Sequence, residues 1–144
     1  MKPPFRLEPL TSEHTRTSFA CGEEPLDRYF KTQVTQDIRR RITNCFVAVE
    51  TISGQIAGYY TIAAASILFT DLPSGEAKRL PRYPTVPAVR IGRLAVDRQL
   101  QGEGLGAALL ADAVRRTLQA PPAAYALLVD AKNDQAVAFY QRYV

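Results

Sequence analysis

The sequence has few residues of the types that bind zinc or form disulfide frameworks. It contains two cysteines, Cys21 and Cys45, which form no CxxC pair, and one histidine, His14. A structural zinc site needs four Cys or His ligands at short spacings, so we expect no metal site. One disulfide could form, but a chain of 144 residues can bury a core without it, and we expect two reduced thiols.

Long hydrophobic runs are also lacking. The longest, Ile62 to Phe69, is interrupted by Ser66 and is far shorter than the roughly 20 residues that cross a bilayer. The N-terminal residues, Met1 to Arg6, do not form the apolar core of a secretory signal. We therefore expect a cytoplasmic protein that makes no contact with a membrane.

Internal repeats, low-complexity tracts and Gly/Ser linkers are absent as well. Hydrophobic residues make up 47% of the sequence and charged residues 22%, which matches globular proteins and differs from disordered chains. Two independent cores in 144 residues would each be marginal in size. The sequence therefore predicts one domain over residues 1–144.

Basic residues outnumber acidic ones by 18 to 14, which gives a formal net charge of +4. This excess favours an anionic partner such as a nucleotide cofactor or RNA. For any one basic cluster, the solvated face of an ordinary element is the simpler explanation. Half of the positive charge lies in three clusters: Arg39–Arg41; Lys78, Arg79 and Arg82; and Arg90, Arg93 and Arg98.

Hydrophobic periodicity and turn residues predict an alternation of strands and helices that is typical of an α/β (α+β) fold with a mixed sheet. The expected strands are Arg6–Pro9, Cys45–Thr51, Ile56–Phe69, Pro87–Val96 and Tyr125–Val129, and the expected helices start at Cys21–Pro25, run from Val34 to Arg41, and span Gly104–Leu118 and Asn133–Tyr143. On the helix from Gly104, we expect Leu109, Ala113 and Val114 to face the sheet. Asp112 and Arg115 are expected to point to solvent.

The sharpest local feature is the strand end Arg93–Asp97, followed by three glycines and an apolar helix. Gly102, Gly104 and Gly106 allow tight turns, and the N–H groups at a helix start bind phosphate. A diphosphate site is one explanation, and a turn that merely needs glycine is the other. Ala107 follows where a P-loop needs Lys-Ser/Thr, and the late GxGxG spacing differs from a Rossmann fingerprint, so both of those classes are disfavoured.

The pattern Gln-x-x-Gly-x-Gly, here Gln101, Gly104 and Gly106, resembles the acetyl-coenzyme A motif of the GCN5-related N-acetyltransferase (GNAT) superfamily. The resemblance covers nearly the whole chain and implies the GNAT fold, a mixed twisted sheet flanked by helices. Other blocks resemble, within that superfamily, the toxin acetyltransferases of type II toxin–antitoxin modules: Phe19–Gly22 with Leu26 and Asp27, Gly58–Thr61, Arg93–Asp97, Val129–Ala131 and Ala138–Tyr140.

This resemblance implies an enzyme that moves acetyl from acetyl-CoA to the α-amino group of aminoacyl-tRNA and thereby blocks translation. It implies charged tRNA and a ribbon-helix-helix antitoxin as partners. In the family the Phe-Tyr segment is followed by a closing pair of strands, whereas this sequence ends at Val144. We therefore expect that pair to be missing and the edge of strand Tyr125–Val129 to be open, which favours a homodimer.

The resemblance also implies which residues carry the chemistry. The Val96 N–H would face the acetyl oxygen, and Tyr140 would protonate the leaving thiolate. Asn133 would serve equally well as a helix N-cap, and Tyr140 as a packing residue. The implied cofactor-binding residues are Leu94, Ala95, Val96, Gln101, Gly102, Glu103, Gly104, Leu105, Gly106 and Asn133.

No strong general base is evident, because His14 lies near the N-terminus and Asp97 and Glu103 fit a loop-capping role as well. An α-amine has a pKa of about 8 and is partly neutral at pH 7, whereas a lysine amine has one of about 10.4, so an α-amine acceptor is favoured. An N-acetyltransferase for protein N-termini or small amines, and a GNAT scaffold without turnover, are the alternatives. The expected tRNA-binding residues are Arg79, Arg82, Arg90 and Arg93, together with Lys78 and, with the dipole of a helix end as its alternative role, the triplet Arg39–Arg41.

Overall fold

The computed structural model describes residues 4–130 and 136–140. Its centre is a six-stranded sheet in the order β1-β2-β3-β4-β5-β6. Neighbouring strands are antiparallel except for the parallel pair β4 and β5. The strands are β1 Phe5–Pro9, β2 Asn44–Glu50, β3 Ile56–Leu68, β4 Thr85–Val96, β5 Ala126–Asp130 and β6 Ala136–Tyr140. The mixed sheet predicted from the sequence is confirmed.

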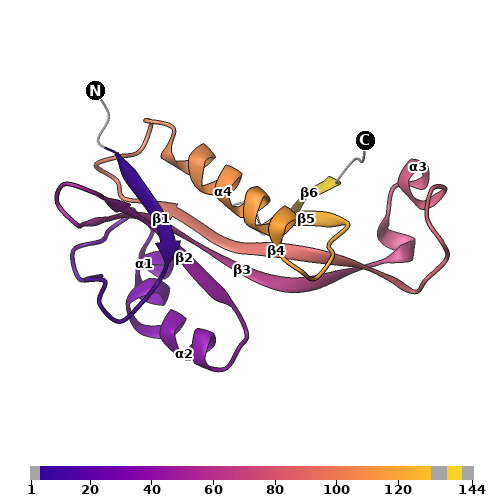
Figure 1. Ribbon diagram of the computed structural model, residues 1–144, viewed down its shortest axis with the longest axis horizontal. Helices are drawn as coiled ribbons and strands as arrows, with labels where there is room; N and C mark the ends of the chain where they lie inside the picture. The colour runs from indigo at the N-terminus through magenta and orange to yellow at the C-terminus, as the bar shows by residue number, and fades with distance from the viewer. Residues whose placement is uncertain (1–3, 131–135, 141–144) are drawn as a thin grey trace.

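Helices cover both faces of this sheet (Figure 1). One face carries α1 (Glu24–Arg28), a π-helical turn (Tyr29–Gln33) and α2 (Val34–Arg39), and the other carries α4 (Leu105–Gln119). Neighbouring strand residues serve opposite faces, because side chains alternate along a strand. Tyr59 packs against the first layer, with its ring 4.2 Å from that of Phe30, whereas Tyr60 packs beneath α4.

A long arm extends beyond the two helical layers (Figure 1). It consists of the outer parts of β3 and β4, a 3-10 turn (Phe69–Asp71) and the short helix α3 (Ser74–Ala77). Ile67, Leu72 and Val86 form a small hydrophobic cluster in it. Over residues 4–130 and 136–140, no helix combines the length and the apolar character needed to cross a membrane.

The thiols of Cys21 and Cys45 are free, as the sequence predicted, and both are buried in the cluster beneath α1 and α2. Burial raises the pKa of Cys45 to about 12, so this thiol stays protonated at neutral pH. The two cysteines therefore act as small hydrophobic residues of the core.

The C-terminal segment differs from the sequence-based prediction of a helix over Asn133–Tyr143. Residues Ala136–Tyr140 form β6, which pairs with β5 so that Ala136 lies opposite Asp130 and Tyr140 opposite Ala126. The backbone groups of β5 would otherwise form an open edge, and Val, Phe and Tyr favour strands, so pairing prevails over helix formation. The edge that the sequence predicted to be open is thus paired within the chain.

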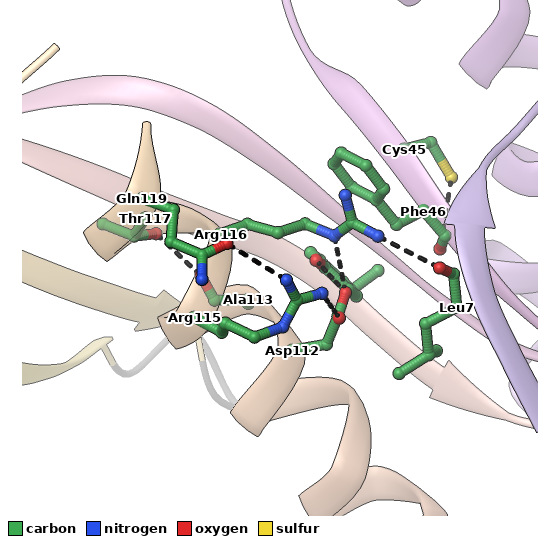
Figure 2. Close-up of polar contacts among 10 residues, drawn as sticks. Leu7, Cys45, Phe46, Asp112, Ala113, Arg115, Arg116, Thr117 and Gln119 are labelled. Atoms are coloured by element: carbon green, nitrogen blue, oxygen red, sulfur yellow. Dashed lines mark hydrogen bonds and ion pairs between the residues drawn. The ribbon is translucent and has the colours of Figure 1, made fainter. Parts of the chain in front are cut away.

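The orientation of α4 also differs from the helical-wheel prediction. Asp112 is buried, with 5% of its surface exposed, whereas Val114 retains 38% exposure. The Asp112 carboxylate accepts hydrogen bonds from Arg115 at 2.6 Å, Arg116 at 2.8 Å and the Tyr60 hydroxyl at 2.8 Å, and these partners make its burial tolerable. Arg116 also donates to the backbone oxygen of Leu7 at 3.0 Å and so joins α4 to β1 (Figure 2).

Candidate active site at the end of strand β4

Strand β4 separates from β5 before it ends. The two strands pair from Ala88 to Ile91, and in the described part of the sheet the remaining residues of β4, up to Val96, have no partner on that edge. A bulge in the β3–β4 pairing lies at the same point, because Ile91 and Arg93 pair with adjacent residues of β3 and leave Gly92 as the extra residue. The backbone of β4 is therefore accessible from the β5 side over its last five residues.

The open edge presents the backbone groups of alternate residues. The N–H groups of Arg93 and Asp97 point toward β3, where they donate to Thr61 Oγ1 at 3.0 Å and to the Ala57 oxygen at 2.8 Å. Because successive N–H groups of a strand point to opposite edges, those of Leu94 and Val96 point to the open edge. These are the two residues for which the sequence predicted backbone contacts with the acetyl-bearing arm of the cofactor.

The turn after β4 is fixed by Asp97. Its carboxylate accepts hydrogen bonds from the backbone N–H groups of Gln99 at 3.0 Å and Ala20 at 3.3 Å. The N–H of Leu100 donates to the Asp97 backbone oxygen at 2.8 Å. Asp97 therefore caps the loop and does not face the open edge as a base, which agrees with the loop-capping alternative.

The glycines of the loop have two different roles. Gly102 and Gly104 have φ angles of +85° and +87°, which side chains disfavour, so the turn itself explains both. Gly106 has no such φ, and a Cβ added there would lie 3.9 Å from Val96 Cγ2 and 4.0 Å from Leu94 Cδ2, an ordinary contact distance. The fold therefore leaves room for a Cβ at Gly106. Because glycine has no side chain, this space beside the open edge stays empty.

Helix α4 begins directly after this loop and offers its first N–H groups to a ligand. Ala108 donates to the Gly104 oxygen at 3.1 Å, whereas the N–H groups of Leu105, Gly106 and Ala107 precede the first intrahelical acceptor. Such a helix start favours anions. The donors fit the diphosphate of acetyl-CoA, and the open edge of β4 fits its extended arm.

Gln101 does not point its side chain toward this phosphate site. Its amide nitrogen donates to the backbone oxygens of Cys21 at 2.8 Å and Val96 at 3.0 Å. The sequence predicted Gln101 as a cofactor-binding residue from its place in the motif. It gave no signal for the contact with Cys21, which lies 80 residues away.

A cleft of about 540 Å³ lies between the end of β4 and the segment before α1. One wall is the strand end Leu94–Val96 with Arg98 and Gln101, and the other is formed by Cys21, Gly22, Glu23 and Leu26. The second wall was not predicted as part of the site, because its residues come from a region 68 or more positions earlier in the sequence. An acceptor that enters here meets the open edge of β4.

The predicted tRNA-binding residues are not brought together. Arg79 and Arg82 are exposed on the arm, far from the end of α2, where the triplet Arg39–Arg41 begins (Figure 1). Arg93 is half-buried, and its guanidinium stacks 3.5 Å from the ring centre of Tyr29. Arg90 is half-buried on β4. Of the predicted basic residues, those of the arm and those of the triplet Arg39–Arg41 are exposed, at separate places on the molecule.

The two remaining predicted residues lie in the C-terminal segment. Asn133 is outside the described residues. The backbone of Tyr140 lies opposite Ala126 in β5, which itself pairs with Ala88 in β4. Ala88 precedes Val96 by eight strand residues, or roughly 26 Å at 3.3 Å per residue. In β6, then, the Tyr140 backbone lies at the opposite end of β4 from the open edge.

Comparisons with known proteins agree with this geometry. Residues 11–143 match the family model of the acetyltransferase (GNAT) domain. A relative from Mycobacterium tuberculosis (strain ATCC 25618 / H37Rv), a tRNA-acetylating toxin, is 38% identical over 126 residues, which cover 86% of this chain and 74% of the relative.

Two solved structures of the toxin AtaT share the fold. AtaT complexed with acetyl-methionyl-tRNAfMet has a TM-score of 0.83 and 28% identity, with 95% of each chain covered. An AtaT variant bound to the C-terminus of the antitoxin AtaR and to acetyl-CoA has a TM-score of 0.73 and 25% identity, with 94% of this chain and 92% of that chain covered. The chain belongs to the GNAT family of acetyltransferases, which take their acetyl group from acetyl-CoA.

Proposed function

We propose that this acetyltransferase acetylates the α-amino group of aminoacyl-tRNA and acts as the toxin of a type II toxin–antitoxin pair. The observation that carries the proposal is the open edge of β4, with a phosphate-binding helix start on one side and a cleft for an acceptor on the other. The likeness to a tRNA-acetylating toxin and to AtaT with acetyl-methionyl-tRNA supports the choice of acceptor.

The residues of the site favour an acceptor that needs little help to lose a proton. When bound, acetyl-CoA supplies a thioester whose carbonyl carbon is attacked by the amine. The Val96 N–H would donate to the carbonyl oxygen, where negative charge would develop. His14 is engaged by Glu8 at 2.7 Å and by the Thr11 N–H at 2.9 Å, outside the residues that line the cleft. An α-amine, with a pKa of about 8, is already partly neutral, so the reaction proceeds without a strong base.

The acceptor is identified by acetylation assays with radiolabelled acetyl-CoA and three acceptors: charged tRNA, a peptide with a free N-terminus, and a small amine. We expect transfer to charged tRNA, with a rate that falls as salt rises. Transfer to peptides or small amines alone, independent of salt, would assign the other acetyltransferase class. Calorimetric binding of acetyl-CoA without any transfer would identify a scaffold.

Gly106→Val should weaken cofactor binding without unfolding the protein. The Cβ of the new side chain lies at ordinary contact distance from Leu94 and Val96, and the side chain should fill the space through which a ligand reaches the open edge. We expect the dissociation constant for acetyl-CoA to rise by about tenfold or more, which corresponds to about 1.4 kcal/mol. Calorimetry checks the affinity. The control Ala107→Val, an exposed position on the same turn, should bind normally, and equal losses in both variants would place the cofactor elsewhere.

The exposed arginines of the arm should contact the tRNA backbone. Reversing both charges, Arg79→Glu with Arg82→Glu, should raise KM for charged tRNA and reduce the salt slope of binding by about 0.7–0.9 per lost phosphate contact. Transfer to a small amine should not change. The control is the double variant Arg39→Glu with Arg40→Glu, which makes the same change in net charge at the end of α2. An equal effect there would mean that the attraction of the tRNA is not specific to the arm.

We also propose partners for the protein in the cell. A ribbon-helix-helix antitoxin would hold the toxin inactive and bring DNA binding to the complex, and the likeness to AtaT bound to AtaR supports an antitoxin. A homodimer would give the complex the two-fold symmetry that is common in such assemblies. The target, charged tRNA, implies action in the cytoplasm. Light scattering tests the dimer, and co-purification with the neighbouring small reading frame tests the antitoxin.

A further inference from the structure

The side chain of Gln101 joins the glycine loop to both walls of the cleft. It donates to Val96 at the end of β4 and to Cys21 in the opposite wall, at 3.0 Å and 2.8 Å. Both partners are backbone carbonyl oxygens, which only accept hydrogen bonds, so the amide nitrogen must face them and both of its protons are used. Gln101 thus has no remaining amide proton for a phosphate.

The backbone of Cys21 connects Gln101 to helix α1. Its N–H donates to the Asp27 carboxylate at 2.9 Å, while its oxygen accepts from Gln101. Two further hydrogen bonds join Ala20 to the preceding turn, at Asp97 and Arg98, but they do not involve the glycine loop. The Gln101 amide is therefore a direct contact between the glycine loop and the wall that contains Cys21.

We propose that Gln101 is a positioning residue that couples acetyl-CoA binding to the shape of the acceptor wall Cys21–Leu26. This inference rests on the proposed function, because it takes this wall as the place where the acceptor amine enters. A diphosphate held by the first N–H groups of α4 fixes the loop, and Gln101 then fixes the Cys21 oxygen and the start of α1. The two substrates consequently bind with positive coupling, because the first one lowers the ordering cost of the second.

Four variants separate this role from a merely structural one. Gln101→Glu places a carboxylate against two carbonyl oxygens to which it cannot donate, and Gln101→Ala removes the donor without adding charge. Gln101→Arg restores N–H donors and should rescue the coupling. Gln99→Glu makes the same charge change at an exposed glutamine of the same loop and is the matched control.

Hydrogen exchange measures the coupling without any catalysis. In the wild type, saturating acetyl-CoA should slow amide exchange over residues 20–29. In Gln101→Glu and Gln101→Ala this gain should fall by about tenfold, as expected for the loss of two hydrogen bonds of modest net strength, although acetyl-CoA still binds. Gln101→Arg and Gln99→Glu should keep the gain. In transfer assays, the first two variants should raise KM for the acceptor by about tenfold and change kcat by less than about threefold.

The outcomes also distinguish this inference from the proposed function. Loss of the exchange gain in the Glu and Ala variants, without tRNA acetylation by the wild type, would keep the coupling and refute the acceptor. The coupling would be overturned if acetyl-CoA slowed exchange in Gln101→Glu and Gln101→Ala as much as in the wild type. It would also be overturned if this slowing were lost in Gln99→Glu. Variants that remain folded by circular dichroism but no longer bind acetyl-CoA would show that Gln101 is a cofactor ligand, which also overturns it.

Discussion

Asp112→Ala is expected to lower the free energy of unfolding by about 2–4 kcal/mol. Removing one member of a buried ion pair typically costs about 3–5 kcal/mol because the partner is left without its counter-charge. The cost is somewhat smaller here, since the side chain of Arg116 retains 26% exposure and can reach water. The Tyr60 hydroxyl is fully buried and loses its acceptor, and this loss alone costs about 1–3 kcal/mol. The lost ion pairs with the two arginines supply the rest of the expected decrease.

Urea denaturation, with all variants at the same pH, measures this loss. Asp71→Ala is the matched control, because Asp71 is an exposed aspartate in the arm, and we expect it to change stability by less than about 0.5 kcal/mol. If Asp112→Ala were no more destabilising than this control, the hydrogen bonds of Asp112 would contribute nothing to the packing of α4 on the sheet.

The difference in stability between the wild type and Asp112→Ala should depend on pH. Burial raises the pKa of Asp112, but the hydrogen bonds from Arg116, Arg115 and Tyr60 outweigh burial and hold it below its ordinary value of 3.8. A carboxyl whose pKa is lower in the folded state stabilises that state above the unfolded pKa and loses this effect as pH falls through the folded pKa. The difference in stability between wild type and variant should therefore be full at neutral pH and shrink below about pH 4.

The wrong prediction that Asp112 points to solvent shows what a helical wheel cannot predict. The period of α4 identifies the face that carries Leu109 and Ala113, and this face was predicted correctly. Whether a polar residue at the margin of that face is buried depends on its partners. Arg116 is four residues away on the same helix, but Tyr60 is 52 residues away on β3, and its position is known only from the assembled sheet.

The glycine loop was predictable because its causes are local. A strand, glycines with positive φ and a helix start follow one another within the segment Arg93–Gly106, so their order in sequence is their order in space. The opposite wall of the cleft has no such local cause. Cys21 and Gln101 meet because the segment before α1 packs on the sheet beside the end of β4, where Cys21 shares a cluster with Ala95.

The last strand shows a third kind of limit. The five residues Ala136–Tyr140 are too few to separate a helical period from a strand alternation. Their conformation is decided by β5, whose free edge supplies backbone partners. The resemblance to a family in which this segment is helical favoured the other outcome, and the choice between the two conformations determines where Tyr140 lies.

Tyr140→Phe is expected to lower kcat for tRNA acetylation by about 10²- to 10⁴-fold, the usual contribution of a general acid. A leaving thiolate needs a proton, and a phenol with a pKa of about 10 carries one at neutral pH. Affinity for acetyl-CoA should stay the same, because the variant keeps the ring. Calorimetry and single-turnover kinetics measure the two quantities, and Tyr83→Phe, at a tyrosine with 66% exposure on the arm, is the matched control.

The pH profile of the same variant separates a chemical role from a packing role. If Tyr140 donates the proton, wild-type kcat falls as pH rises through the pKa of the phenol, and the variant loses this alkaline limb. The strand β6 holds the Tyr140 backbone opposite Ala126, at the far end of β4 from Val96. Donation at Val96 therefore requires residues 136–140 to leave β5, and acetyl-CoA together with an acceptor should speed amide exchange in Ala126–Asp130. Unchanged kcat in Tyr140→Phe, with β5 protected throughout, would leave Tyr140 a strand residue and assign the proton to water.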